Sequence, residues 1–80
     1  MTQAQVHERL TGILREVFDD PALVVAETTV ASDVAGWDSL AHVGLIVAVE
    51  KAFKVRFTTK EVKNLANVGD FIRLIEKRAL

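Results

Sequence analysis

The chain has 80 residues, half of them hydrophobic, with no cysteine and a formal net charge of -1. A domain of this length buries roughly 60% of the surface that the unfolded chain exposes, so a large enclosed cleft and a self-sufficient enzyme are not expected. The balanced charge disfavours nucleic-acid binding, and the lack of cysteine excludes disulfides, thiolate metal sites and a protein thiol nucleophile.

The beginning of the chain predicts no targeting segment. Met1 is not followed by a positive and then apolar leader, and no apolar run approaches the length that spans a membrane. We therefore expect a cytoplasmic protein without membrane insertion. The chain starts at Met1 and ends just after the last predicted helix, which favours a free-standing protein. We also expect a monomer with one domain over residues 1–80.

The first predicted helix begins near Gln3. Thr2 and Gln5 have the spacing of a capping box, in which each side chain satisfies a backbone N–H group at the start of a helix. Apolar residues then recur at three- and four-residue spacing, which indicates an amphipathic helix; they are Val6, Leu10, Ile13, Leu14, Val17 and Phe18. The run from Asp19 to Pro21 ends this helix.

A long loop follows, because neither a helical nor a strand period persists from Asp19 to Asp38. Leu23, Val24, Val25 and Val30 are apolar, and we expect them to tuck this loop against a core. A loop of such length is uncommon in a compact domain, which favours a functional role for it.

The second predicted helix runs from Ser39 to Phe53. Asp38 and Ser39 are both favourable helix-capping residues, and the helix contains no proline. One apolar side is formed by Leu40, Val43, Ile46, Val47 and Phe53, and Leu45, Ala48 and Val49 widen it. A helix that is apolar around most of its circumference is expected at the centre of a bundle.

Two shorter helices complete the prediction. Residues 54–57 alternate between polar and apolar, but a single strand would have no partner, so we interpret them as an extended connection. Thr58 and Glu61 form a second candidate capping box, which opens a short helix that ends near residues 64–67. Asn67 can cap the last helix. The predicted fold is therefore an all-α four-helix bundle with a long first loop and a short third helix.

The segment from Asp33 to Leu40 carries the chemically interesting residues, and three interpretations compete for it. Asp38 or Ser39 can simply cap the helix. Ser39 can instead act as a nucleophile with His42 one helical turn away, although no orienting group or oxyanion hole is evident. Finally, Ser39 can be a covalent attachment point, because a phosphodiester there would meet backbone N–H donors and the positive end of the helix dipole.

An ordered set of motifs resembles the acyl carrier protein family over nearly the whole chain. Asp38-Ser39-Leu40 matches the block at the start of the family's second helix. Downstream, residues 43–53 carry the family's apolar positions, a glutamate and a final phenylalanine. Phe57, Thr58 and Glu61 resemble the start of its third helix, and residues 67–72 resemble the Thr-Val-Gly-Asp entry into its last helix.

The resemblance implies a carrier and not an enzyme. Ser39 would receive 4′-phosphopantetheine from coenzyme A, and Asp38 would help the transferase and its magnesium ion engage the site. The thiol of this arm would carry acyl groups as thioesters in fatty acid, polyketide or related biosynthesis. The implied partners are a phosphopantetheinyl transferase, an acyl-activating ligase or acyltransferase, and a ketosynthase or other acyl-processing enzymes.

Four residues are candidates for partner contact: Trp37, Leu40, Val47 and Glu50. Core packing is the favoured alternative for Leu40 and an even one for Val47, and we expect Trp37 to be partly buried. Many carriers of fatty acid synthesis have a strongly acidic second helix that docks on basic patches. Here Ala41, Gly44 and Lys51 stand where such carriers often have acids, which favours a specialised pathway over housekeeping fatty acid synthesis.

The main alternative is a helical interaction module that docks through its second helix without any covalent group. It predicts that Ser39→Ala leaves function intact, whereas a carrier would lose its function. Loss of a capping residue at this position would cost about 1 kcal/mol. His7 and His42 are too isolated for a metal site, and the basic residues between Lys51 and Lys63 are interpreted as a solvated face.

Overall fold

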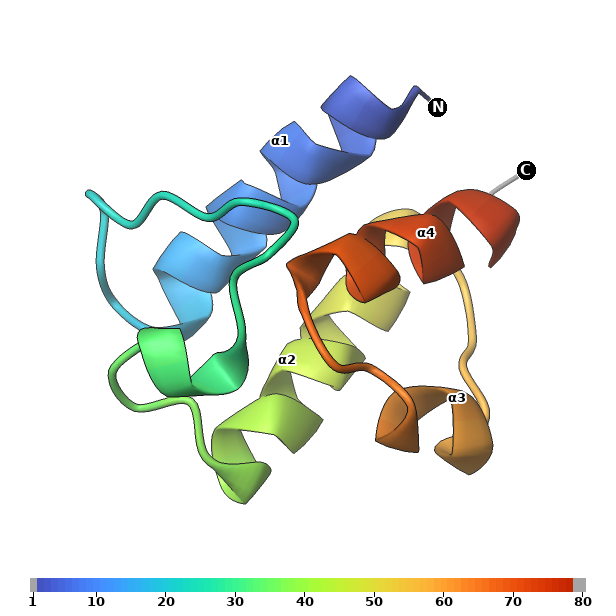
Figure 1. Ribbon diagram of the computed structural model, residues 1–80. Coiled ribbons are helices and arrows are strands. Elements are labelled where there is room, and N and C mark those ends of the chain that lie inside the picture. Colours follow the sequence, from blue (N-terminus) through green and yellow to red (C-terminus); the bar gives the residue numbers. More distant parts are fainter. Residues whose placement is uncertain (1, 79–80) are drawn as a thin grey trace.

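The computed structural model describes residues 2–78, and it is built from helices joined by loops (Figure 1). The elements are α1 (Gln3–Val17), the short 3-10 helix η1 (Ala31–Asp33), α2 (Ser39–Phe53), α3 (Thr59–Lys63) and α4 (Val68–Arg78). No strand occurs within residues 2–78. The predicted all-α fold with a long first loop and a short third helix is confirmed.

Side-chain caps begin the helices where the sequence predicts them. The Thr2 hydroxyl accepts from the Gln5 backbone N–H at 3.2 Å, while the Thr2 backbone N–H donates to the Gln5 side chain at 2.9 Å. Thr58 and Glu61 form the same reciprocal pair. The Asn67 side-chain oxygen accepts from the Asp70 backbone N–H at 2.8 Å. These local bonds define the starts of α1, α3 and α4.

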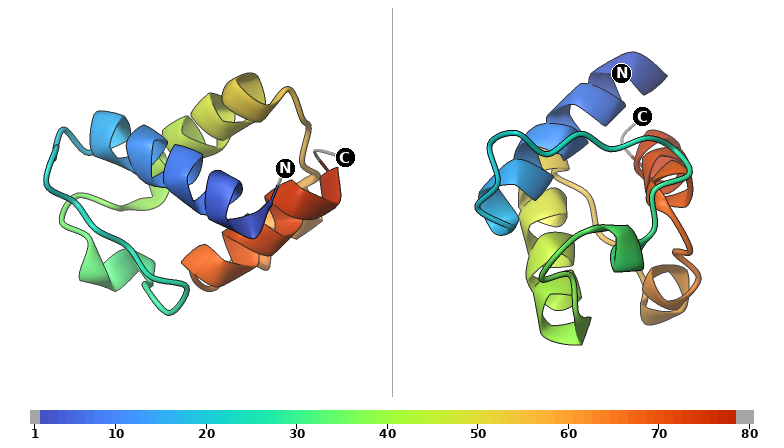
Figure 2. Two further views of the ribbon diagram at one scale, coloured as in Figure 1. Left: turned by 90° about the horizontal axis from the view of Figure 1, so that it is seen from above. Right: turned by 60° about the vertical axis from the view of Figure 1, so that its left-hand side comes forward.

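The core lies where α1 packs against both α2 and α4 (Figure 2). Its fully buried side chains come from all three helices: Val6, Leu10, Leu14, Leu45, Val49, Val68, Phe71, Ile72 and Ile75. The prediction that α2 lies at the centre of the bundle is wrong: α2 contributes only one arc to the core, and α1 is the helix that packs against two others. The prediction that Leu40 packs in the core is wrong, because its side chain is 83% exposed.

The short helix α3 is tied to its neighbours through one carboxylate. The Thr58 backbone N–H donates to Glu61, and the Arg78 guanidinium forms an ion pair with the same side chain. Both contacts lower the pKa of the Glu61 carboxyl. The connection before α3 differs slightly from the prediction, because Lys54 adopts a left-handed conformation with φ 56° as the C-cap of α2. Residues 55–58 form neither helix nor strand.

The long loop is anchored mainly through its backbone. The first N–H groups of α4 donate to it, from Val68 to the Thr29 carbonyl at 2.9 Å and from Gly69 to the Glu27 carbonyl at 2.8 Å. Val25 is buried as predicted, whereas Val24 is 79% exposed, so that its predicted packing is wrong. The sequence does not predict the helix η1, because three residues are too few to show a helical periodicity of apolar side chains.

A matched pair of glycine substitutions tests this anchoring. A Cβ at Gly69 would lie 3.0 Å from the Glu27 carbonyl oxygen, so Gly69→Ala must displace the loop and should destabilise the fold by about 1–3 kcal/mol. A Cβ at Gly44 meets nothing within 4 Å, and Gly44→Ala should stabilise α2 by about 0.5–1 kcal/mol. Urea unfolding measures both. Equal stability of the two variants would contradict the close contact between the loop and α4.

Candidate functional site

Asp38 and Ser39 divide two roles at the start of α2. Asp38 is the N-cap, and its carboxylate accepts from the Ala41 backbone N–H at 2.8 Å. Ser39 is the first helical residue, and its side chain is exposed. Within residues 2–78 no hydrogen bond occupies the Ser39 hydroxyl. Of the two capping candidates, Asp38 takes the role, which leaves the Ser39 hydroxyl accessible.

A glycine turn positions these residues. Gly36 has φ 85°, a conformation that glycine adopts without strain. The Trp37 backbone N–H donates to the Val34 carbonyl at 3.2 Å, and the Asp38 backbone N–H donates to the Gly36 carbonyl at 3.0 Å. This turn ends the long loop and carries the chain into α2.

Trp37 is partly buried, as predicted, and it joins the loop to α2. Its ring lies 5.5 Å from that of Phe18 and 6.1 Å from that of His42, measured between centroids. The Trp37 indole N–H also donates to His42 Nδ1 at 3.1 Å. The sequence shows the spacing of these two residues but not their pairing. The contact gives His42 a structural role in holding Trp37.

The geometry does not support the nucleophilic pairing of Ser39 with His42. Nδ1 of His42 accepts from Trp37, and among the described residues no hydrogen bond joins this imidazole to Ser39. The part of the chain that the structure describes also contains no cluster of three His, Cys, Asp or Glu side chains suited to a metal ion. His7 contacts the Val25 carbonyl at 2.8 Å, far along the chain from Ser39.

An open cleft of about 410 Å³ lies beside Ser39. Its lining combines the loop, α2 and the segment after α3: Ala31, Trp37, Asp38, Ser39, His42 and Leu65. A small hollow of about 40 Å³ shares part of this lining and is bordered by Phe71. Ala31 and Leu65 were missed as site residues, because nothing local in the sequence signals that they meet Ser39.

The start of α2 fits an anionic group on the serine. Among residues 2–78, the backbone N–H groups of Ser39 and Leu40 have no protein acceptor, whereas Ala41 and His42 are satisfied by Asp38. Unsatisfied N–H groups and the positive end of the helix dipole favour a phosphate at this position. A slender chain attached there could lie along the adjacent cleft.

The candidate partner residues do not all share one face. Leu40 is 83% exposed and Val47 is 44% exposed, and Val43, which is 61% exposed, lies between them. Glu50 is half-buried, and its carboxylate accepts from the Phe57 backbone N–H at 2.9 Å. Trp37 instead packs against Phe18 and His42. The sequence did not indicate that Val43 would be exposed.

Among residues 2–78, no helix combines the length and the apolar character needed to cross a membrane.

Comparisons with known proteins agree on one family. Residues 8–75 match the family model described as "Phosphopantetheine attachment site". The acyl carrier protein of Acidothermus cellulolyticus is 35% identical over 75 residues, which cover 94% of this chain and 89% of that protein. The acyl carrier protein of Helicobacter pylori strain J99 is 36% identical over 74 residues, or 91% and 94% of the two chains.

A solved structure supports the same assignment. The solution structure of the holo acyl carrier protein from Geobacter metallireducens superposes with a TM-score of 0.87 at 42% identity, covering 91% of this chain and 84% of that one. The arrangement of the helices thus agrees with the sequence matches. The chain belongs to the acyl carrier protein family, and it is a carrier with a 4′-phosphopantetheine prosthetic group rather than an enzyme.

Proposed function

We propose that Ser39 is the residue that carries 4′-phosphopantetheine. The observation that carries this proposal is the exposed Ser39 hydroxyl at the start of α2, beside a carboxylate that takes over the capping role. In the loading reaction, the hydroxyl oxygen bonds to the phosphorus next to pantetheine and loses its proton. The bond from this phosphorus to the adenosine bisphosphate of coenzyme A breaks.

The arm supplies the thiol that the chain lacks. As a thioester, an acyl group is more reactive towards nucleophiles and carbanion formation, and the flexible tether presents it to several enzymes at high effective concentration. The partners we propose are a phosphopantetheinyl transferase, an acyl-activating ligase or acyltransferase, and a ketosynthase or related enzyme. The carrier contributes recognition and presentation.

Several finer assignments belong to the same proposal. Residues 1–80 would form one monomeric carrier domain that acts in the cytoplasm. Leu40 and Val47 would contact partner enzymes, since both are exposed on α2. Trp37 and Glu50 would support this face from within, because their polar atoms bond to His42 and Phe57. The low acidity of α2 favours a specialised biosynthetic pathway over housekeeping fatty acid synthesis.

Asp38 is proposed to act twice, as the cap of α2 and as a contact for the transferase and its magnesium ion. Asp38→Asn keeps a good capping side chain, so the free energy of unfolding should change little. It removes the charge, and loading by the transferase should slow by about tenfold, as expected for the loss of a charge-assisted contact.

Asp38→Ala is the matched comparison for Asp38→Asn. It removes both the cap and the charge, and it should slow loading similarly while costing about 1 kcal/mol of stability. Loading kinetics by mass spectrometry and urea unfolding separate the two effects. Loading of Asp38→Asn at the wild-type rate would contradict a role for this carboxylate in transferase recognition.

The function is tested by the intact mass of the protein before and after incubation with coenzyme A, magnesium and a broad-specificity phosphopantetheinyl transferase. We expect a gain of one phosphopantetheine group on the folded protein. A second carrier that is known to be loaded controls for transferase activity. Failure of this chain alone to gain mass would favour a non-covalent interaction module that docks through α2.

A further inference from the structure

An exposed ridge runs along α2 from the proposed attachment site. Leu40, Val43, Val47 and Lys51 follow one another at three- and four-residue spacing, which places them on one side of a helix. All four are exposed, whereas the buried arc of α2 is formed by other residues. We call these four residues the docking ridge. Because it starts next to Ser39, a partner that receives the arm would approach it.

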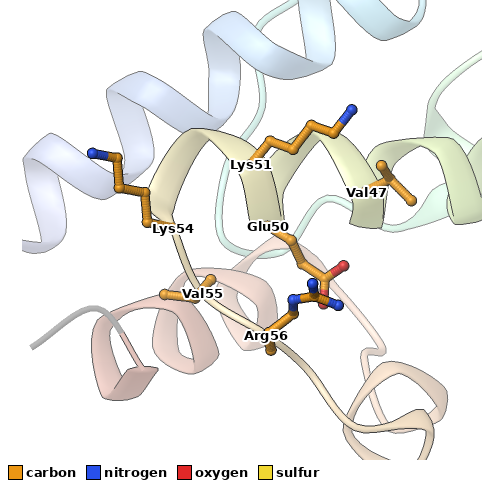
Figure 3. Close-up of a pocket in the computed structure, with 6 residues that line it drawn as sticks. All are labelled: Val47, Glu50, Lys51, Lys54, Val55 and Arg56. Atoms are coloured by element: carbon orange, nitrogen blue, oxygen red, sulfur yellow. The ribbon is translucent and has the colours of Figure 1, made fainter.

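The far end of the docking ridge is cationic. Lys51, Lys54 and Arg56 are exposed, and together with Val47, Glu50 and Val55 they line an open groove of about 500 Å³ (Figure 3). None of these three cations forms an ion pair within residues 2–78. The only acidic residue of α2 is Glu50, which lines the same groove and accepts from the Phe57 backbone N–H. Three cations against this one carboxylate leave the groove with a positive balance.

The charge distribution along the chain extends this local picture. Residues 39–80 contain eight Lys or Arg but only four Asp or Glu. Residues 1–38 contain two Lys or Arg and seven Asp or Glu. A net charge near zero therefore hides a basic second half. A surface that pairs apolar side chains with several cations is complementary to an apolar hollow bordered by carboxylates.

We propose that the docking ridge and its basic groove bind partner enzymes whose carrier entrance is acidic. Burial of Leu40, Val43 and Val47 supplies the apolar contact, and the groove supplies cations that steer and orient an anionic rim. A basic entrance would place like charges opposite Lys51 and Arg56. This inference rests on the proposed function, because it places the entrance next to an arm on Ser39.

The test uses the loaded carrier with two forms of one ketosynthase, a natural form with a basic carrier entrance and a variant with those basic residues replaced by glutamate. For each ketosynthase form, the rate of acyl transfer from the carrier is divided by the rate from free acyl-pantetheine. This small substrate has no docking ridge, so the ratio corrects for changes in the catalytic activity of the ketosynthase itself. We expect the wild-type carrier to react about tenfold faster with the glutamate form at low salt, and this advantage should shrink as salt rises.

Two variants with the same net charge complete the design. Lys51→Glu/Arg56→Glu should reverse the preference, whereas Lys63→Glu/Lys77→Glu, which changes exposed residues of α3 and α4, should retain it. Equal rates with both ketosynthase forms, or a preference of the wild-type carrier for the basic form, would overturn the proposal. Intact mass measured beforehand separates this result from a failure of loading, which would overturn the proposed function instead.

Discussion

Ser39→Ala is expected to abolish phosphopantetheine loading completely while leaving the fold intact. The substitution removes the only hydroxyl at the start of α2, so no oxygen remains to bond to the phosphorus. The cap survives, because the Ala41 backbone N–H donates to Asp38 and not to Ser39. The free energy of unfolding should therefore change by less than about 0.5 kcal/mol, in place of the loss of about 1 kcal/mol that the sequence suggests for a capping residue.

Ser32→Ala is the matched control, since Ser32 and Ser39 are the only serines of the chain. Ser32 is also exposed and lies in the short helix η1, on the loop that precedes the site. Intact mass after treatment with transferase should show full loading of Ser32→Ala and none of Ser39→Ala. Residual loading of Ser39→Ala would mean that another hydroxyl is used.

Leu45→Ala is expected to have the largest effect on stability. The Leu45 side chain is fully buried on the arc of α2 that contacts the core, so its truncation loses apolar burial and leaves a cavity. Substitutions of this kind cost about 2–5 kcal/mol. Since small domains are marginally stable, much of the protein should unfold near body temperature.

Leu40→Ala makes the same chemical change five positions earlier on the same helix. The side chain is 83% exposed, and its truncation should change the free energy of unfolding by less than about 0.5 kcal/mol. Urea unfolding followed by circular dichroism measures both variants. Similar losses at the two positions would contradict the orientation of α2, and Leu40→Ala with normal stability but slower acyl transfer would agree with a docking role.

Local sequence signals predict the helices of this protein well. The capping pairs at Thr2 and Thr58 and the cap at Asn67 act over three residues, and the structure contains each of them. The start of α2 at Ser39 follows from the same kind of signal. Such bonds depend on neighbours in the chain, so they can be recognised without knowing the fold.

The orientation of α2 and the path of the long loop depend on distant parts of the chain. An apolar residue stands on nearly every side of α2, and only packing against α1 decides that Leu45 is buried and Leu40 is not. The loop is held by carbonyl groups that accept from Val68 and Gly69, some 40 residues later in the chain. Backbone carbonyls are common to all residues, so composition and periodicity carry no signal for this contact.

In the candidate site, too, some features follow from the local sequence and others depend on distant parts of the chain. The motif around Ser39 predicts the serine and its neighbour as site residues, but it leaves open which of them caps α2, and only the contact from Ala41 to Asp38 decides this. The pairing of Trp37 with His42 and the lining of the cleft by Leu65 arise from side chains that meet only in the folded protein.

The attachment of phosphopantetheine to Ser39 is tested most directly by tandem mass spectrometry of the proteolysed, loaded protein. If Ser39 carries the arm, the added mass lies on the peptide that contains Asp38-Ser39-Leu40, and the fragment ions assign it to Ser39. Attachment at Ser32, or at a threonine of the long loop, would contradict the assignment of the start of α2 as the attachment site.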